Sequence, residues 1–436
     1  MKRYIKPISV ILIFFCLISY SWPAKSNREN HQIIKRREAG IETNGHRHRV
    51  TGYYPAYSSK IQSPSDLNIE LYTDLIFFVA ATEPGLKLGY GNIPRDLWEL
   101  LVQEFVKHCK AANVIPRMAI GSWGGSVYFS DLLSTNEKRH KYANFLTKYA
   151  QERGFEGLDI DWEYPHKAGI GCNKNRPDDM ANFGEFLSIL RKIWPKGIFS
   201  SAVPIGGFAS DAGTLIQAES LRKMIDSLDY VNVMAYDVFG SWSQSTGPNA
   251  PFASTSSGSV KGGAIGASVV DSVRILTDQG FKKSQIVVGI PGYGYSYTLA
   301  SPELNTTNAG GVPSQLYQNK LAQCPPGGST DGRPSVDICG VKTGWGGTWR
   351  YRELVENGFL SKDGKNGLNG YKRHFDQGTQ TPFLTKSTWL LSYDDEESGN
   401  VKAEFVKSSG VAGIFYFDTL GPTDDIIKSA VSILNS

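Results

Sequence analysis

Eight short apolar runs recur along the chain from residue 50 onward, and longer amphipathic segments fill several of the gaps between them. Near-continuous apolar runs of this length are typical of strands buried in a parallel sheet, and the segments between them show helical periodicity. Eight such units predict an α/β fold, a closed (β/α)8 TIM barrel, with an open Rossmann-like sheet as the alternative. The runs are VTGYYPAY (50–57), DLIFFVAA (74–81), IPRMAIGSW (115–123), GLDIDWEY (157–164), FSSAVP (199–204), YVNVMAYD (230–237), IVVGIPGYGY (286–295) and GVAGIFYFD (410–418).

The stretch between the seventh and eighth runs is too long for one connecting helix. Residues from 296 to about 385 are rich in Gly, Asn and Pro, and they contain WGGTW and YRELVENGF. We interpret them as a small inserted α+β subdomain, so that residues 50–295 and 386–436 form the barrel. A chain of 436 residues is long enough for one domain of this size.

The N-terminal segment has the composition of a targeting sequence. MKRYIK is basic, ISVILIFFCLISY is apolar, and small residues follow. This pattern predicts a secretory signal peptide over residues 1–21, with an uncleaved signal anchor as the alternative. Residues 22–49 are polar and basic without hydrophobic periodicity, which predicts a disordered leader. We therefore expect a secreted protein, free or associated with a cell wall.

Charge and cysteine content narrow the partners and the compartment. The net charge of +4 is small and lies largely in the leader, which argues against nucleic-acid binding, and no later stretch is apolar enough to enter a membrane. Four cysteines follow the signal, an even number that suits an oxidising compartment. Cys324 and Cys339 enclose a loop rich in Gly, Pro and Ser, so we favour pairing them, which leaves Cys109 with Cys172. Asn305 begins an Asn-Thr-Thr glycosylation sequence.

The fourth run, within EGLDIDWEYP (156–165), places acids at alternate positions. Side chains alternate between the faces of a strand, so Asp159, Asp161 and Glu163 point the same way, into a barrel, whereas Glu156 does not. Burial and mutual repulsion would raise at least one pKa and provide a proton donor near neutral pH. A stabilising ion network and a metal site are the alternatives. The stretch itself offers no Arg or Lys, and seven histidines without paired spacing argue against a metal.

The motif DxxDxDxE followed by an aromatic residue and Pro resembles glycoside hydrolase family 18, with Glu156 in place of its first Asp. Four further segments resemble family motifs in the same order along the chain. The resemblance covers about residues 50–436. These segments are Gly52-Tyr53-Tyr54, Met234-Ala235-Tyr236-Asp237, Gly289-Ile290-Pro291-x-Tyr293-Gly294 and Tyr393-Asp394-Asp395-x-x-Ser398.

The resemblance implies a chitinase with a retaining, substrate-assisted mechanism, without a cofactor. Glu163 would be the acid and base, and Asp161 would orient the substrate's 2-acetamido group. Asp159 would share a proton with Asp161, Tyr236 would bind the acetamido carbonyl, and Asp237 would support the same sugar. We expect a monomer that acts on chitin or chitin oligosaccharides. A chitin-binding lectin and an endoglycosidase acting on N-glycans are the alternatives.

Aromatic and apolar residues at matching positions are expected to bind the sugars. The chain departs from the family at Ala119-Ile120-Gly121-Ser122, where SxGG is usual, at Tyr295 in place of a basic residue, and at Phe417 in place of Trp. We interpret Trp162 as packing between strand and helices, and Trp349 and Trp242 as further candidates for the groove. The expected substrate-binding residues are Tyr53, Trp123, Met234, Tyr293, Phe417 and Trp345.

Overall fold

The structure is a computed structural model that describes residues 48–209, 214–254, 267–309 and 311–436. The predicted signal peptide (1–21) and nearly all of the predicted leader (22–49) lie outside these residues. Strand β1 begins at Arg49, so the last residue assigned to the leader belongs to the fold. No helix within the described residues is long and apolar enough to span a membrane.

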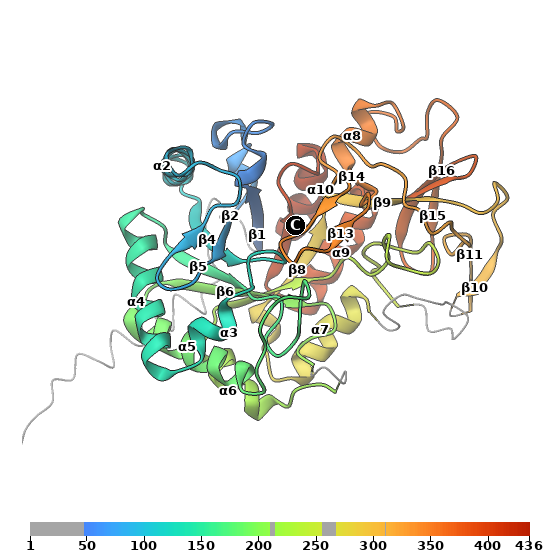
Figure 1. The fold of residues 1–436 in the computed structure, drawn as a ribbon. Helices are drawn as coiled ribbons and strands as arrows, with labels where there is room; N and C mark the ends of the chain where they lie inside the picture. The colour runs from blue at the N-terminus through green and yellow to red at the C-terminus, as the bar shows by residue number, and fades with distance from the viewer. Residues whose placement is uncertain (1–47, 210–213, 255–266, 310) are drawn as a thin grey trace, which may run out of the picture. The chain divides into compact units, whose positions relative to one another are not determined.

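Eight parallel strands close into a barrel, which confirms the predicted fold class (Figure 1). Their order around the barrel is β1, β18, β8, β7, β6, β5, β4 and β2, and β2 pairs again with β1. The short β3 (Leu88–Gly89) adds to β2 in the antiparallel sense. The barrel strands are β1 (Arg49–Pro55), β2 (Asp74–Thr82), β4 (Ile115–Gly121), β5 (Gly157–Asp161), β6 (Ile198–Pro204), β7 (Tyr230–Met234), β8 (Ile286–Pro291) and β18 (Gly413–Phe417).

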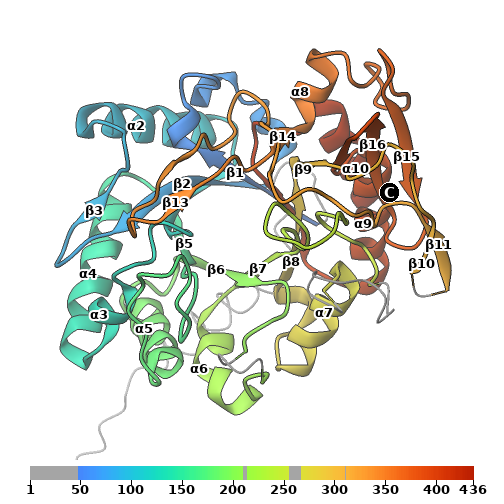
Figure 2. The same ribbon diagram turned by 45° about the vertical axis from the view of Figure 1, so that its right-hand side comes forward.

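Helices surround the barrel (Figures 1 and 2), and some of them end at capping groups that the sequence provides. The Thr135 hydroxyl caps α4, the Asp395 carboxylate caps α9, and Gly410 ends α9 in the left-handed conformation. The helices are α2 (Arg95–Ala111), α3 (Phe129–Leu133), α4 (Asn136–Glu152), α5 (Asp179–Ile193), α6 (Ala218–Ser227), α7 (Val269–Asp278), α9 (Glu396–Ser409) and α10 (Asp424–Asn435). Short 3-10 turns cover Ala56–Ser58, Pro64–Asp66, Ile69–Leu71 and Lys283–Gln285.

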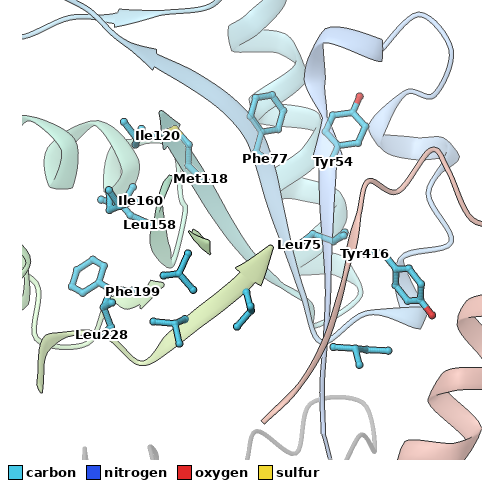
Figure 3. Close-up of a cluster of buried hydrophobic side chains, with 14 of the residues drawn as sticks. Tyr54, Leu75, Phe77, Met118, Ile120, Leu158, Ile160, Phe199, Leu228 and Tyr416 are labelled. Atoms are coloured by element: carbon cyan, nitrogen blue, oxygen red, sulfur yellow. The ribbon is translucent and has the colours of Figure 1, made fainter. Parts of the chain in front are cut away.

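The largest hydrophobic cluster includes alternate residues of successive barrel strands, such as Phe77 on β2, Met118 on β4 and Ile160 on β5 (Figure 3). They are completely buried, together with helix residues such as Phe105. Since neighbouring residues of a strand point to opposite faces, the residues between them face the barrel interior. The interior therefore receives the polar residues of these strands, including Asp159.

A subdomain occupies the chain between β8 and β18, as expected from the sequence. Its five-stranded antiparallel sheet has the order β14, β9, β17, β16, β15 and runs from Tyr293 to Ser392, slightly beyond the predicted limits on both sides. The elements are β9 (Tyr293–Thr298), α8 (Tyr351–Glu356), β14 (Thr348–Arg350), β15 (Lys372–Asp376), β16 (Thr381–Lys386) and β17 (Trp389–Ser392), with hairpins of β10 (Thr307–Ala309) and β11 (Val312–Ser314), and of β12 (Ser335–Val336) and β13 (Lys342–Thr343).

A buried ion cluster lies among the barrel strands, below the level of the acids on β5. Asp74 on β2 is fully buried and pairs with the guanidinium groups of Arg117 on β4 and Arg49 on β1. The hydroxyls of Thr51 and Thr73 donate to the same carboxylate at 2.8 and 2.9 Å. Burial alone would raise the pKa of Asp74, but the two guanidinium groups hold it below its usual value.

Replacing Asp74 with Asn should strongly destabilise the protein, because two buried guanidinium groups would lose their counter-charge. We expect Asp74→Asn to lower the free energy of unfolding at pH 7 by roughly 3–5 kcal/mol, measured by urea denaturation. Asp425→Asn is the matched control, since Asp425 is exposed and only loosely paired with Lys428. Equal stability of the two variants would contradict a structural role for the cluster.

Candidate active site

Strand β5 carries a graded series of acids toward the carboxyl end of the barrel. Asp159 is 0% exposed, Asp161 4% and Glu163 9%. The strand ends at Asp161, so Glu163 lies two residues further, at the end where barrel enzymes place their active sites. Glu156, which precedes the strand, is exposed and does not belong to the series.

Asp159 is held by donors from three other strands. The Tyr53 hydroxyl on β1 donates to Oδ2 at 2.9 Å, and the Ser200 hydroxyl on β6 donates to Oδ1. Asn232 on β7 donates to Oδ1 at 3.2 Å. Ala119 on β4 faces Asp159 across the strand pair and provides no hydroxyl. On the other side of β5, Ser200 of β6 is paired with Asp159 and provides a hydroxyl.

Arg117 connects Asp159 to the ion cluster below it. One nitrogen of its guanidinium donates to the Ser200 hydroxyl, while the others bind Asp74. Burial raises the pKa of Asp159, and the positive charge of Arg117 opposes this effect together with the hydrogen bonds from Ser200 and Tyr53. If Asp159 and Asp161 share one proton, that proton is thus better placed on Asp161.

Asp161 lies between two other acids and lacks comparable partners. Its Oδ1 is buried without a hydrogen-bond partner among the described residues. Burial, followed by repulsion from Glu163 and Asp159, raises the pKa of Asp161 well above its usual value. Among Asp159, Asp161 and Glu163, it is therefore Asp161 whose protonated form is favoured.

Glu163 is a proton donor poised near neutral pH. Burial raises its pKa from the usual 4.5 to about 7, with a further contribution from the charge of Asp237 and an opposing hydrogen bond from Tyr164. Its backbone is fixed on both sides, because its N–H donates to the Ser126 hydroxyl at 3.0 Å and its carbonyl accepts from Asn173 at 2.8 Å.

The residues after β7 form a second polar group at the same end of the barrel. Tyr236 is 7% exposed, and Asp237 follows it in the left-handed region at φ 59°. The side chain of Asp237 is exposed to solvent on one side. Protein atoms surround the rest of it closely, and the resulting loss of hydration raises its pKa. The hydroxyls of Tyr293 and Tyr295 both donate to its Oδ1, at 2.7 and 2.8 Å. Tyr295, where a basic residue was expected, thus contributes a neutral donor.

Exposed aromatic rings follow the ends of the barrel strands. Trp123 after β4 is 50% exposed, Trp242 after β7 is 59% exposed, and Tyr57 after β1 is 55% exposed. Phe417 ends β18 and is half-buried, with its ring stacked 5.9 Å from that of Tyr236. Large rings open to solvent beside buried acids suit a polymer of sugars, whose apolar faces stack on aromatic side chains.

Residues 49–420 match the family model Glycosyl hydrolases family 18. The chain belongs to this family. It is 32% identical over 387 residues to a chitinase-like effector from Moniliophthora roreri, covering 87% of this chain and 91% of that protein. It is 27% identical to chitinase A1 from Niallia circulans, over 73% of this chain and 42% of that protein.

A solved chitinase structure from Rhizomucor miehei shares the fold of this family 18 hydrolase. The TM-score is 0.76 at 24% identity, covering 88% of this chain and 99% of the other. This likeness agrees with the closed barrel described above, and the family match identifies the chain as a glycoside hydrolase.

The predicted sugar-binding residues of this hydrolase differ in how far solvent reaches their side chains. The Tyr53 ring is 2% exposed, so it supports Asp159 instead of offering a stacking surface. Trp349 packs inside the subdomain against Phe359 and Trp389. Trp345 is half-buried on the segment before β14. Met234 is partly buried at the end of β7, in the cluster that contains Tyr236.

Sequence reasoning missed four residues of the site: Arg117, Ser200, Asn232 and Tyr57. A signal existed for Arg117, because it is a lone charge within the apolar run IPRMAIGSW. Tyr57 ends the first run and follows β1 by two residues, as Trp123 follows β4. Ser200 and Asn232 gave no such signal, since their roles depend on the register between strands.

Both expected cysteine pairings are wrong. The disulfide joins Cys172, in the loop after β5, to Cys339 at the tip of the β12–β13 hairpin. Cys109 is a free, buried thiol on α2, and Cys324 is also free. The bond spans 167 residues, a proximity that loop composition and cysteine parity cannot reveal.

Glu163 should make the protein less stable as the pH rises. The folded protein holds this proton more tightly than the unfolded chain, so stability is lost as the pH rises from about 4.5 to about 7. Between pH 5 and pH 8, wild type should lose about 2–3 kcal/mol relative to Glu163→Gln, which stays neutral. Urea unfolding at both pH values measures this difference.

Glu219→Gln on the exposed side of α6 is the control, and it should follow wild type at both pH values. A pH-independent difference between wild type and Glu163→Gln would contradict the raised pKa.

Proposed function

We propose that this protein is a secreted chitinase that hydrolyses β-1,4 bonds between N-acetylglucosamine units with retention of configuration. The observation that carries the proposal is the position of Glu163, a carboxyl with a pKa of about 7 at the barrel rim, above two more deeply buried acids. An acid with this pKa can donate a proton and later accept one at neutral pH.

The first step cleaves the glycosidic bond without an enzyme nucleophile. Glu163 protonates the bridging oxygen, and the leaving sugar departs with that proton. The acetamido oxygen of the substrate attacks the anomeric carbon and forms a cyclic oxazolinium ion. Asp161 orients the acetamido N–H and stabilises the positive charge, while Tyr236 donates to the acetamido group.

The second step returns the proton and opens the ring. The Glu163 carboxylate takes a proton from water, the hydroxide attacks the anomeric carbon from the face that the first sugar left, and the acetamido group is restored. Asp159 and Asp161 share one proton. Asp159 receives three hydrogen bonds and lies next to Arg117, so it is the anion while Asp161 carries the proton before substrate binds. When Asp161 binds the acetamido N–H, this proton passes to Asp159, and Asp161 is then the anion that stabilises the oxazolinium charge. Asp237 positions the same sugar together with Tyr293 and Tyr295.

The substrate assignment rests on the acetamido requirement and on the exposed rings. Trp123, Trp242, Tyr57 and Phe417 provide stacking surfaces near the acids, and Trp345 is the further candidate from the subdomain. The relative from Niallia circulans is named chitinase A1, and the one from Moniliophthora roreri is named a chitinase-like effector. Chitin or its oligosaccharides are thus the proposed substrate, bound by a monomer without a cofactor.

Secretion is supported by the basic and apolar N-terminal segment and by the disulfide. Disulfides persist in oxidising compartments, and the structure contains one between Cys172 and Cys339. Residues 50–436 are the proposed catalytic domain, with residues 1–21 as signal peptide and the following segment as a leader. Asn305 is exposed in a loop and is the proposed glycosylation site.

A chitin-oligosaccharide-binding protein without turnover is the second candidate. Phe417, with a smaller ring than the expected Trp, favours it, as does the name chitinase-like effector of the relative with 32% identity. Tight binding of a chitin hexamer by wild type with no product would establish this second function in place of the first.

Glu163→Gln should abolish most hydrolysis because the variant keeps the shape of the side chain and loses the proton. We expect kcat on the N-acetylglucosamine hexamer to fall by roughly 10²–10⁴-fold, with binding retained. Products are quantified by mass spectrometry, which also gives the positions of the bonds that are cleaved.

Glu156→Gln is the matched control: the same change in the same motif, at an exposed position outside the acid series. It should retain wild-type activity within about twofold. High residual activity of Glu163→Gln would show that another group is the acid.

A further inference from the structure

The backbone of Glu163 lies beyond the strand pairing of β5. Pairing of β5 with β4 ends at Asp161, and pairing with β6 ends at Ile160. Two side chains bind the peptide groups of Glu163 instead: its N–H donates to the Ser126 hydroxyl at 3.0 Å, and its carbonyl accepts from Asn173 at 2.8 Å. The position of the acid therefore depends on how firmly these two side chains are held.

Ser126 is fixed to the barrel itself. It is 1% exposed, and its hydroxyl donates to the carbonyl of Asp161, the last residue of β5, at 3.0 Å. The contact on this side of Glu163 is thus lost only if the strand moves.

Asn173 depends on the loop that carries it. It lies in the connection between β5 and α5, where residues 162–178 form neither helix nor strand. Asn173 is 6% exposed, and its Oδ1 has no hydrogen-bond partner among the described residues, so its amide is held through the contact with Glu163. Whatever fixes this loop therefore determines whether Asn173 stays against the carbonyl of Glu163.

The loop fits closely around this contact. Gly169 adopts the left-handed conformation at φ 53°, and a Cβ there would lie 2.1 Å from the carbonyl oxygen of Glu163 and 2.5 Å from the amide nitrogen of Asn173. Only glycine leaves room for this approach. A small displacement of the loop is enough to break the contact.

Ion pairs anchor the end of the loop that leads into α5. Arg176 and Lys174 bind the carboxylate of Asp131 on α3, at 2.6 and 2.9 Å. The Lys174 side chain is 70% exposed, so its ion pair contributes little to fixing the neighbouring Asn173. A stronger anchor lies on the other side of Asn173.

That anchor is the disulfide between Cys172 and Cys339. It joins the residue directly before Asn173 to the β12–β13 hairpin of the inserted subdomain. The turn of this hairpin is closed by the Asp337 carboxylate, which accepts from the N–H groups of Cys339 and Val341 at 2.9 and 2.8 Å. The bond therefore attaches the loop beside the acid to an ordered turn.

The hairpin is also held at its base. The carboxylate of Asp331, 9% exposed, accepts from the backbone N–H groups of Gly327 and Gly347 at 2.8 and 3.1 Å. These bonds join the chain before the hairpin to the chain after it. The hairpin thus gives Cys172 a supported attachment.

We propose that the Cys172–Cys339 disulfide positions the acid of the active site: it holds Asn173 against the carbonyl of Glu163 and so fixes the peptide that carries the proton donor. Asn173 is the positioning residue in contact with Glu163, and the disulfide acts through it. Through this bond the inserted subdomain supports the acid at the end of β5. The inference rests on the proposed role of Glu163 in chitin hydrolysis.

Asn173→Leu removes the donor and keeps the size of the side chain. We expect kcat on the N-acetylglucosamine hexamer to fall by about tenfold or more, because a displacement of about 1 Å at a reacting group can cost about 100-fold. KM should stay within about threefold, since the groups that bind the sugars are unchanged. Asn175→Leu, at an exposed position in the same loop, is the matched control and should behave as wild type.

Equal kcat values of wild type and Asn173→Leu would overturn the positioning role. No hydrolysis by wild type would instead overturn the proposed function. Circular dichroism of each sample measures the folded fraction, and kcat is expressed per folded molecule.

A second test determines whether the disulfide acts through Asn173. Cys172→Ser/Cys339→Ser should lower kcat by about threefold or more when Asn173 is present. The same change should lower kcat by less than about twofold in Asn173→Leu, where the contact is already lost. Losses that multiply in the combined variant would show that the disulfide and Asn173 act independently, which would overturn the proposal.

The pH dependence of kcat/KM separates positioning from a general loss of stability. Burial raises the pKa of Glu163 to about 7, and a loosened loop lets water reach the carboxyl group, so that its pKa falls toward 4.5. The basic limb of the profile should therefore move to lower pH in Asn173→Leu and in the double cysteine variant. An unshifted limb in both would contradict the positioning role. Both variants retain the titratable groups that surround Glu163, namely Asp161, Tyr164, Tyr236 and Asp237.

Reduction of wild type breaks the same bond without a substitution. Cys172 is exposed, so a mild reductant can reach the disulfide. The reduced protein should match the double cysteine variant in kcat and in pH profile. Cys324→Ser, which removes a free thiol of the subdomain, is the control and should respond to the reductant as wild type does. A reduced protein with the kcat of the oxidised one would overturn the proposal.

Discussion

The charges inside the barrel have to balance. Below the catalytic level, two guanidinium groups, Arg49 and Arg117, lie with two carboxyl groups, Asp74 and Asp159, joined by ion pairs and by the Ser200 hydroxyl. Guanidinium groups stay charged at all accessible pH values, so this layer is neutral when both carboxyl groups are ionised. No cation remains in it for the acids above.

The reactivity of the upper acids follows from this balance. Asp161 lies between two other carboxyl groups with a buried, unpartnered oxygen, and Glu163 has a pKa of about 7. Both groups make the folded state less stable at neutral pH than neutral residues would, which is common for groups with perturbed pKa values in active sites. The buried ion pair of Asp74 and Arg117 stabilises the strands directly below these destabilising acids.

The fold and the acid series could be read from local patterns, whereas the supporting groups could not. Alternation on one strand is enough to place Asp159 inside the barrel, and eight apolar runs are enough to predict the closed sheet. Contacts between distant strands, such as Arg117 with Ser200, depend on register. The Cys172–Cys339 bond depends on the path of an insertion whose short strands carry no periodicity. Tyr53 matched a family position but is buried, and only the structure shows its use.

Proton NMR during hydrolysis of the N-acetylglucosamine hexamer tests the central claim most directly. If the acetamido oxygen attacks the anomeric carbon and Glu163 then directs water to the same face, the new reducing end appears first as the β anomer, and the α anomer grows later by mutarotation. A new reducing end that appears first as the α anomer would mean inversion by direct attack of water, and it would contradict this account of the acid series.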